Sequence, residues 1–379
     1  MFLARIFKSA LSAALIASLA VASPVLAGEV IDCPGRDAPF SESTPLIDIF
    51  LSPQARAVAE RELELSFDKM PPVFLRTDGP SFAAILTLEQ AAGMGGKALA
   101  DVERALAKLA EVPVTDADRA ARCARYDNDV PEFDLPRRDG PAILLFEKIT
   151  GFRDGPSVDA AHKAFTAMAA RKGWAIASTE MGGAINADTL SQFDLIVWNN
   201  ISGDVLTLTQ RQALRDFVEG GGGFVAVHGS AGDPSYFWDW YVDTLIGARF
   251  AGHPMNPQFQ DARVAIEDFD HPAVAGLPGE FTMNDEWYSF KTNPRDSGAR
   301  VIATLDESTY EQSGRFGESL AMGDHPIAWS KIVGRGRMFY SAMGHRPEIY
   351  EDPRFVTLFE NAIAWAAGID DCDCGAARE

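Results

Sequence analysis

Cysteine is scarce in this chain, and its placement excludes one kind of chemistry. The four cysteines are Cys33, Cys123, Cys372 and Cys374. All lie outside the region where strands and helices alternate, so that region offers no thiolate nucleophile. Four cysteines allow three pairings. In an oxidising compartment we expect a Cys33–Cys123 disulfide, with Cα atoms about 4.4–6.8 Å apart. For Cys372 and Cys374, which are two residues apart, three alternatives stay open: a disulfide in a small strained ring, a metal site, or free thiols.

Long hydrophobic runs are also missing, except at the N-terminus. Arg5 and Lys8 precede an apolar run, "LSAALIASLAVA", and "VLAG" offers a cleavage site after Ala27. The pattern predicts a signal peptide over residues 1–27, with an uncleaved anchor as the alternative. We therefore expect an exported protein, periplasmic or secreted, with no membrane insertion after signal cleavage.

Positive charge is in short supply as well. Lysine and arginine total 34 against 54 acidic residues, and losing Arg5 and Lys8 would change the net charge from −20 to −22. So acidic a protein repels nucleic acid and anionic membrane surfaces, and we expect neither as a partner. The charge favours solubility and says nothing about chemistry.

The residues present divide the chain into two compositional regions. Residues 28–140 carry helical spacing, with Ser52 and Thr115 as N-cap candidates, and end in a polar, proline-bearing linker. We expect this region to be mainly helical and packed against the rest, and the sequence assigns it no role. Residues 141–368 form a second domain, followed by a tail at 369–379.

The second region alternates strands with helices. Almost wholly apolar strands are predicted at 142–147, 174–180, 194–200 and 223–228, with helices between them. This pattern predicts a parallel α/β sheet covered by helices on both faces. Past Ser235 the alternation loosens into further strands, a hairpin that turns at "GRGR", and a last helix that begins at Pro353.

Polar side chains stand where the predicted strands end. Ligands of open parallel sheets bind outside the carboxyl ends of the strands. Those ends carry Glu147, Asn199, Asn200 and His228. The sequence therefore predicts a site at this edge, with His228 at its centre.

Histidines gather in the second region, but in no compact metal motif such as H-E-x-x-H. His253, His271 and His325 each precede proline, and His345 follows Gly344. Asp285 and Glu286 supply carboxylates between these histidines in the sequence. Histidine suits both proton transfer near neutral pH and metal ligation. We expect His228 and His345 to line one cleft with at least one of Asp285, Glu286 and His253. The metal state and any cofactor stay open.

A serine hydrolase is a lesser alternative. "HGSAG" approaches the nucleophile-elbow pattern G-x-S-x-G and would make Ser230 the nucleophile. His228 stands in the position of the first glycine, where a side chain crowds the strained turn. The pattern therefore argues against this mechanism more than for it.

Nine segments in order resemble the trehalose-utilisation (ThuA-like) family. They are "TGFRDG", "FDLIVWNNISGDVLT", "LRDFVEGGGGFVAVHGSAG", "WDWYVDTLIGARFAGHP", "DHPAVAGLP", "DEWYSF", "GDHPIAW", "GRGRMFYSAMGH" and "NAIAWAAG". The resemblance covers about residues 141–368. It implies a flavodoxin-like fold related to class I glutamine amidotransferases, and a link to sugar and keto-sugar metabolism.

The resemblance also places His228 where related amidotransferases carry their cysteine, which argues against glutaminase activity. This chain departs from the family pattern at one position: the family commonly has a histidine soon after the Phe-Arg pair, and here Asp154 follows Arg153. A carboxylate therefore stands in the first loop.

The sequence leads to an exported protein that acts on, or binds, a sugar or keto-sugar by acid–base chemistry without a cysteine nucleophile. The predicted catalytic residues are His228, His345, Asp285 and Glu286. The predicted substrate-binding residues are Arg153, Asp154, Asn199, Asn200, His253, Tyr288, His325 and Trp329, whose aromatic members suit sugar faces. A sugar-binding or scaffold protein without turnover is the main alternative, and the oligomeric state stays open.

Overall fold

The computed structural model describes residues 30–77, 79–136 and 140–369. The predicted signal peptide and the Cys372/Cys374 pair lie outside these residues. The part of the chain from Ile31 onward forms one compact unit. None of the helices in the described ranges has the length and apolar character needed to cross a bilayer.

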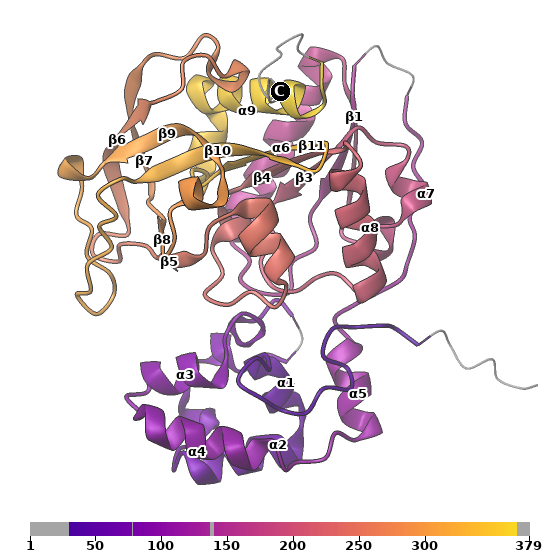
Figure 1. The fold of residues 1–379 in the computed structure, drawn as a ribbon, viewed down its shortest axis with the longest axis vertical. Coiled ribbons are helices and arrows are strands. Elements are labelled where there is room, and N and C mark those ends of the chain that lie inside the picture. Colours follow the sequence, from indigo (N-terminus) through magenta and orange to yellow (C-terminus); the bar gives the residue numbers. More distant parts are fainter. Residues whose placement is uncertain (1–29, 78, 137–139, 370–379) are drawn as a thin grey trace, which may run out of the picture. The chain divides into compact units, whose positions relative to one another are not determined.

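A nine-stranded sheet organises the second region, and five of its strands are parallel (Figure 1). In sheet order these are β2 (Ala175–Thr179), β1 (Ala142–Phe146), β3 (Leu195–Asn199), β4 (Gly223–Val227) and β11 (Gly336–Ser341). The strands that the sequence predicts at 142–147, 194–200 and 223–228 therefore lie parallel in one sheet. The parallel α/β prediction is confirmed.

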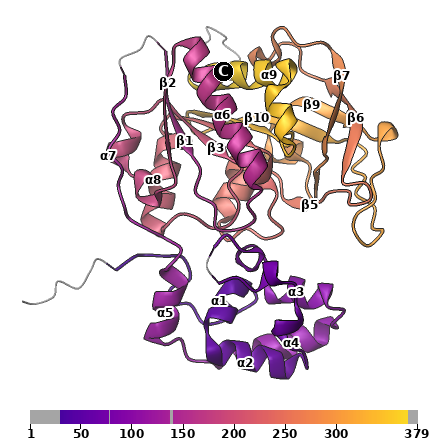
Figure 2. The same ribbon diagram turned by 180° about the vertical axis from the view of Figure 1, so that it is seen from behind.

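Helices cover both faces of the parallel strands. Figures 1 and 2 show α6 (Gly155–Lys172) and α9 (Pro353–Ala366) on one face and α8 (Leu208–Glu219) on the other. Local sequence sets their ends: Thr207 and Gln210 form a capping box before α8, and Asp352 caps α9. The short helix α7 (Ala187–Leu190) begins at the Asn186 cap.

Four antiparallel strands extend the sheet beyond β11. Their order is β10 (Pro326–Val333), β9 (Arg300–Asp306), β6 (Phe259–Ile266) and β7 (Glu280–Glu286). Each pairs antiparallel with its neighbour, so β7 runs in the same direction as β11 and ends at the same edge. A separate small sheet pairs β5 (Phe250–Gly252) with β8 (Ser289–Phe290).

Residues 31–126 form a helical block with a core of its own. It contains α1 (Leu46–Leu51), α2 (Pro53–Glu62), α3 (Leu88–Met94), α4 (Leu99–Leu109) and α5 (Asp116–Cys123). Phe40, Ile49 and Phe67 are among the side chains of this core, which is separate from that of the sheet domain. Ser52 and Thr115 cap α2 and α5 as predicted.

The helical block is tied to itself and to the sheet domain. Cys33 and Cys123 form a disulfide with Cα atoms 5.3 Å apart, which confirms the predicted pairing. The Ser81 amide donates to the Thr150 carbonyl at 3.0 Å. The Gln90 side chain donates to the Pro234 carbonyl at 3.1 Å and accepts from the Ser235 hydroxyl at 2.8 Å. The block is therefore packed against the sheet domain, as the sequence predicts.

Candidate functional site

Three strand ends bring the candidate residues to one edge of the sheet. His228 directly follows β4, and His345 lies in the segment after β11, which is parallel to β4. Glu286 is the last residue of β7. β7 is four places from β11 in the sheet, which in a flat sheet would be about 19 Å. Contacts between these strand ends therefore require the antiparallel strands to curl back over the edge.

The backbone at His228 is held in an unusual conformation. His228 has a φ of +35°, in the left-handed region that residues other than glycine rarely adopt. The Tyr340 hydroxyl donates to the His228 carbonyl at 2.9 Å. Gly344 packs beside this turn with a φ of +127°, and a Cβ there would lie 2.8 Å from Val227 Cγ2. Backbone strain of this kind is typical of functional sites, where the surrounding structure maintains it.

Asp285 positions the segment that carries His345. Its carboxylate accepts from the amides of Gly344 at 2.7 Å, His345 at 3.2 Å and Arg346 at 3.1 Å. Burial raises the pKa of Asp285 against the opposing effects of His228 and these amides. The side chain is fully buried and does not line the cavity described below. Asp285 therefore holds the backbone of this segment, and the structure does not place the predicted catalytic carboxylate in the cavity wall.

His228, Glu286 and His345 meet at one point. His228 Nε2 lies 3.0 Å from His345 Nδ1 and 3.3 Å from Glu286 Oε2. His345 Nδ1 lies 3.0 Å from the same carboxylate oxygen. All three residues are buried, and they are the group among the described residues whose ligand atoms are close enough to hold one metal ion.

The outer partners of the two imidazoles determine which nitrogens carry protons. His228 Nδ1 lies 2.6 Å from the Ala342 carbonyl, which can only accept, so Nδ1 is the donor and Nε2 keeps its lone pair. His345 Nε2 lies 3.0 Å from Asp154 Oδ2, so it donates there and leaves Nδ1 facing the cluster. Two imidazole lone pairs and a carboxylate oxygen then converge. Such a set needs a shared cation, either a proton or a metal ion.

The charges around the cluster are consistent with this need. Burial opposes ionisation of Glu286, but its close contacts with the imidazoles of His228 and His345 outweigh burial and hold the pKa of the carboxyl below its ordinary value. Burial likewise opposes the charged form of His345, but Asp154 and Glu286 raise its pKa to about 10. The site thus stabilises a positive charge between the buried carboxylate of Glu286 and the partly exposed carboxylate of Asp154.

Asp154 and His253 complete the surroundings of the cluster. The hydrogen bond with His345 is the main cause that lowers the pKa of Asp154, whose carboxylate also accepts from the Ser157 hydroxyl at 3.0 Å. His253 Nδ1 lies 3.1 Å from Glu286 Oε1, to which the Gln258 amide donates at 2.5 Å. The carboxylate at 154, the departure from the family pattern, therefore orients an imidazole.

A cavity of about 630 Å³ opens above the cluster. From the sheet domain its wall includes the predicted residues Asp154, Asn200, His228, His253, Glu286, Tyr288 and His345. The predicted convergence of His228, His345, Glu286 and His253 in one cleft is confirmed. Tyr288 packs against His228, with ring centroids 4.0 Å apart. The cavity lies in the volume range of small-molecule sites.

Four predicted substrate-binding residues lie outside the cavity wall. Their polar groups bond to other parts of the protein. Among the described residues, the cavity wall does not include Arg153, Asn199, His325 or Trp329. Trp329 is buried and donates to the Ile246 carbonyl at 2.8 Å, and Asn199 donates to Glu147 at 2.7 Å. His325 bonds the Tyr288 carbonyl at 2.8 Å, and Arg153 pairs with Asp159 at 3.2 Å. The structure therefore does not bring these four into the cavity wall, and their binding role stays a prediction.

Ser230 is occupied by the backbone. Its buried hydroxyl donates to the Trp198 carbonyl at 2.9 Å and accepts from the Ile201 amide at 3.1 Å. The strained turn residue is His228 rather than Ser230. A nucleophile needs an accessible oxygen, and the Ser230 hydroxyl is buried between two backbone groups, so the geometry argues against the serine-hydrolase alternative.

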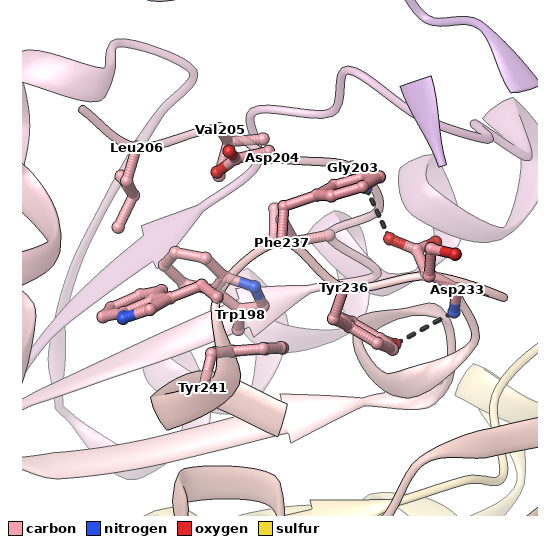
Figure 3. Close-up of a pocket in the computed structure, with 12 residues that line it drawn as sticks. Trp198, Gly203, Asp204, Val205, Leu206, Asp233, Tyr236, Phe237 and Tyr241 are labelled. Carbon is pink, nitrogen blue, oxygen red and sulfur yellow. Dashed lines mark hydrogen bonds between the residues drawn. The ribbon is translucent and has the colours of Figure 1, made fainter. Parts of the chain in front are cut away.

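A second, smaller hollow of about 40 Å³ lies beside Asp233, which also lines the large cavity (Figure 3). Aromatic rings of Trp198, Tyr236 and Tyr241 surround it. One water needs about 10–15 Å³ on such a measure, so this space is too small for a sugar ring. Burial raises the pKa of Asp233 to about 7, against hydrogen bonds from Ser202 and Gly203.

A family model described as trehalose utilisation (ThuA) matches residues 142–366, more than half of the chain. The chain belongs to the ThuA family. This membership implies a role related to trehalose utilisation, and the match leaves the helical block outside it. No curated protein sequence matches the chain.

Solved structures agree with the ThuA fold. A ThuA-like protein from Bacteroides uniformis is 24% identical, with a TM-score of 0.53, over 63% of this chain and 97% of its own. A ThuA-like protein from Parabacteroides merdae is 16% identical, with a TM-score of 0.46, over 60% of this chain and 90% of its own. A GMP synthase protein from Thermoplasma acidophilum is 12% identical, with a TM-score of 0.38, over 62% of this chain and 97% of its own. The Bacteroides uniformis structure therefore shares the fold of this ThuA protein over the matched region.

Sequence reasoning missed one wall of the cavity. The helical block contributes Pro71, Val73, Phe74, Phe82, Ile85, Leu86 and Met94. Gln258, which holds Glu286, was also missed. A polar residue at a strand end is a visible signal, whereas apolar side chains in a helical region are typical of a core.

Proposed function

We propose that this ThuA protein acts on a sugar or keto-sugar at the His228–Glu286–His345 cluster, which holds a divalent cation. The observation that carries the proposal is the convergence of three lone-pair atoms 3.0–3.3 Å apart. Atoms bound to one metal at about 2.0–2.1 Å are separated by roughly 2.9–3.4 Å. Each imidazole also donates its other N–H to an oxygen, as metal-binding histidines do.

Three protein ligands leave a coordination position for substrate, and a cation there would polarise a carbonyl or hydroxyl oxygen. The side chains of the cavity wall supply the rest of the chemistry. His253 is the histidine of the group with the most exposed side chain, at 24%, and Glu286 accepts its Nδ1–H. Its Nε2 is then a free base in the cavity wall.

With a keto-sugar, His253 would remove a proton from the carbon next to the carbonyl. The electron pair of the broken C–H bond passes toward the carbonyl oxygen, and the imidazolium returns the proton to a neighbouring atom. Substrate and product are then isomers, so no oxidant, reductant or covalent enzyme intermediate is needed.

Two measurements test this proposal. Elemental analysis and visible spectra of the Co²⁺-loaded protein should give one bound metal per chain, absent in His228→Ala and retained in His162→Ala. His162 is a matched control, since its ring pairs with Glu147 outside the cavity wall. In D₂O, 3-keto-glycosides should lose the proton beside the carbonyl with the wild type and not with His253→Ala.

The alternatives predict different results. A protein that binds glycosides without proton exchange is the non-catalytic binder that the sequence leaves open. Failure to bind either a metal or a keto-glycoside would overturn the proposal.

We also propose that the protein is exported. The Cys33–Cys123 disulfide supports this, because such bonds persist in oxidising compartments. The mature N-terminus should be Gly28 by N-terminal sequencing of protein from the periplasm or medium, and an intact Met1 in that fraction would count against cleavage.

A further inference from the structure

The two sides of the cavity differ in chemistry. The sheet domain lines it with carboxylates, imidazoles and amides, together with Arg315 and Glu318. The wall from the helical block, by contrast, consists of apolar side chains between Pro71 and Met94. We call this surface the apolar wall: the block side chains Val73, Phe74, Phe82 and Met94, with Phe152 of the sheet domain.

The aromatic members of the apolar wall lie against one another, and part of the wall is open to solvent. Phe74 and Phe82 have ring centroids 5.3 Å apart, and Phe82 and Phe152 have centroids 5.0 Å apart. Val73, Met94 and Phe152 remain 43%, 45% and 41% exposed. Large apolar side chains gathered around a cavity and left exposed are typical of a ligand-binding surface.

From this asymmetry we infer a subsite for an apolar aglycone, so that the substrate is a glycoside with an aromatic or long aliphatic group. The inference rests on the proposed function, since it assigns the sugar to the polar side. None of the block side chains that line the cavity can donate a hydrogen bond, and the thioether sulfur of Met94 is their one acceptor, a weak one. A second sugar against them would lose hydrogen bonds of its hydroxyls to water without replacement, whereas a phenyl or alkyl group gains by burial.

The geometry keeps the apolar wall close to the cluster. A Cβ on Gly151 would lie 2.5 Å from Ile85 Cγ2, so the first loop of the sheet domain packs tightly on the block. Phe152 and Asp154 follow in that loop, and both line the cavity. One short segment therefore carries an aromatic contact and the carboxylate that orients His345.

The test compares ligands with the same sugar and different aglycones on the full-length protein. By calorimetry, phenyl glucoside should bind at least about tenfold more tightly than methyl glucoside, the ratio expected for partial burial of a ring. Phe82→Ala should remove most of this preference and leave methyl glucoside binding unchanged. Phe269→Ala is the matched control, because Phe269 is exposed and does not line the cavity.

Variants at two exposed positions test the inference even if Phe82→Ala does not fold. Val73→Ser and Met94→Gln replace side chains with little packing to lose, and each should reduce the phenyl preference by about two- to fivefold. Equal binding of the two glucosides, no binding of phenyl glucoside, or tighter binding of trehalose than of phenyl glucoside would overturn the inference. Phe82-dependent binding of phenyl glucoside without metal binding or proton exchange would retain the subsite and overturn the proposed function.

Discussion

The sheet domain and the helical block line the same cavity, the first mainly with polar and charged side chains and the second with apolar ones. The sheet domain supplies groups that titrate, among them His228, Glu286 and His345, each held by buried polar partners. The block supplies Phe74, Phe82 and other apolar side chains, and its own core is separate. The proposed reaction therefore depends on hydrogen bonds that position the charged groups of the sheet domain. Ligand binding to the apolar wall depends instead on the burial of apolar surface.

The two regions differ in histidine and tryptophan content, so spectroscopy can distinguish them. All six histidines and all seven tryptophans lie at or after residue 162, within the sheet domain. Tryptophan fluorescence therefore reports on the sheet domain, and histidine protonation acts on it directly. Far-ultraviolet circular dichroism follows the helices of both regions, so a change that it detects and tryptophan fluorescence does not is assigned to the helical block.

The largest expected effect comes from Asp285→Ala on the sheet-domain side. The substitution leaves three backbone amides, at residues 344–346, without their acceptor. We expect a loss of about 3–6 kcal/mol in unfolding free energy, reduced by relief of the buried charge, together with loss of ligand binding. Denaturant titration followed by tryptophan fluorescence measures the change.

Asp285→Asn sharpens that result. Its single acceptor oxygen can still serve two amides, so its stability should fall between wild type and Asp285→Ala. Asp261→Ala, an exposed acidic residue on the neighbouring strand β6, should change stability little. Equal stability of Asp285→Ala and wild type would remove the positioning role.

The disulfide tests the other region. Replacing Cys33 and Cys123 by serine opens a link between residues 90 apart in sequence. The chain-entropy model gives a loss of about 4.6 kcal/mol for a loop of this length, and the loss of a native disulfide typically costs about 2–5 kcal/mol. Circular dichroism should show the block melting at a lower temperature, while tryptophan fluorescence moves less. Coincident transitions by both probes would mean that the two regions unfold as one.

Acid should act on the sheet domain through His271. Burial lowers the pKa of His271 to about 4, and its Nδ1 accepts from the Ala273 amide. Because the folded pKa is below the ordinary value near 6.5, this stability is present above pH 6.5 and is lost as the pH falls toward 4. The loss is on the order of 3 kcal/mol. In His271→Asn, which keeps an acceptor for Ala273, the slope of unfolding free energy against pH between 6.5 and 4 should become flatter. An unchanged slope would contradict this role.

Asp154→Asn should give the smallest effect, and only on function. An amide can still accept from His345 Nε2 but carries no charge, so metal affinity should fall by about 10–100-fold with stability nearly unchanged. Competition with a coloured chelator measures it. If Asp154→Asn and wild type bind the metal equally, Asp154 does not orient His345 for that purpose.

Local patterns in the sequence account for much of the fold. The apolar runs at 142–147, 194–200 and 223–228 predict the parallel strands, because only a sheet covered on both faces buries every side chain of such a run. Thr207 and Asp352 mark helix starts by the same local chemistry that caps them in the structure. His228 is predictable as a site residue because strand direction places its end at the ligand-binding edge.

The partners of His228 were less predictable. Trp329 and His325 match the residue types of a sugar site, but their polar groups hold the backbone at Ile246 and Tyr288. Asp285 and Glu286 are adjacent in sequence, yet only Glu286 lines the cavity. Successive side chains of a strand point to opposite faces, so the sequence alone cannot tell which of the two faces the cavity.

The sequence by itself determined the parallel strands, the helix ends and the place of His228, because each depends on residues close together along the chain. It also determined the ThuA membership, which depends on the order of many such local segments over residues 142–366. The tertiary structure alone decided that β7 curls back to bring Glu286 to His228 and His345, and that a separate helical block forms the opposite wall. The reason is physical. Sheet curvature and packing between two cores depend on side chains far apart in sequence, and apolar residues carry no local mark of whether they face a core or a ligand.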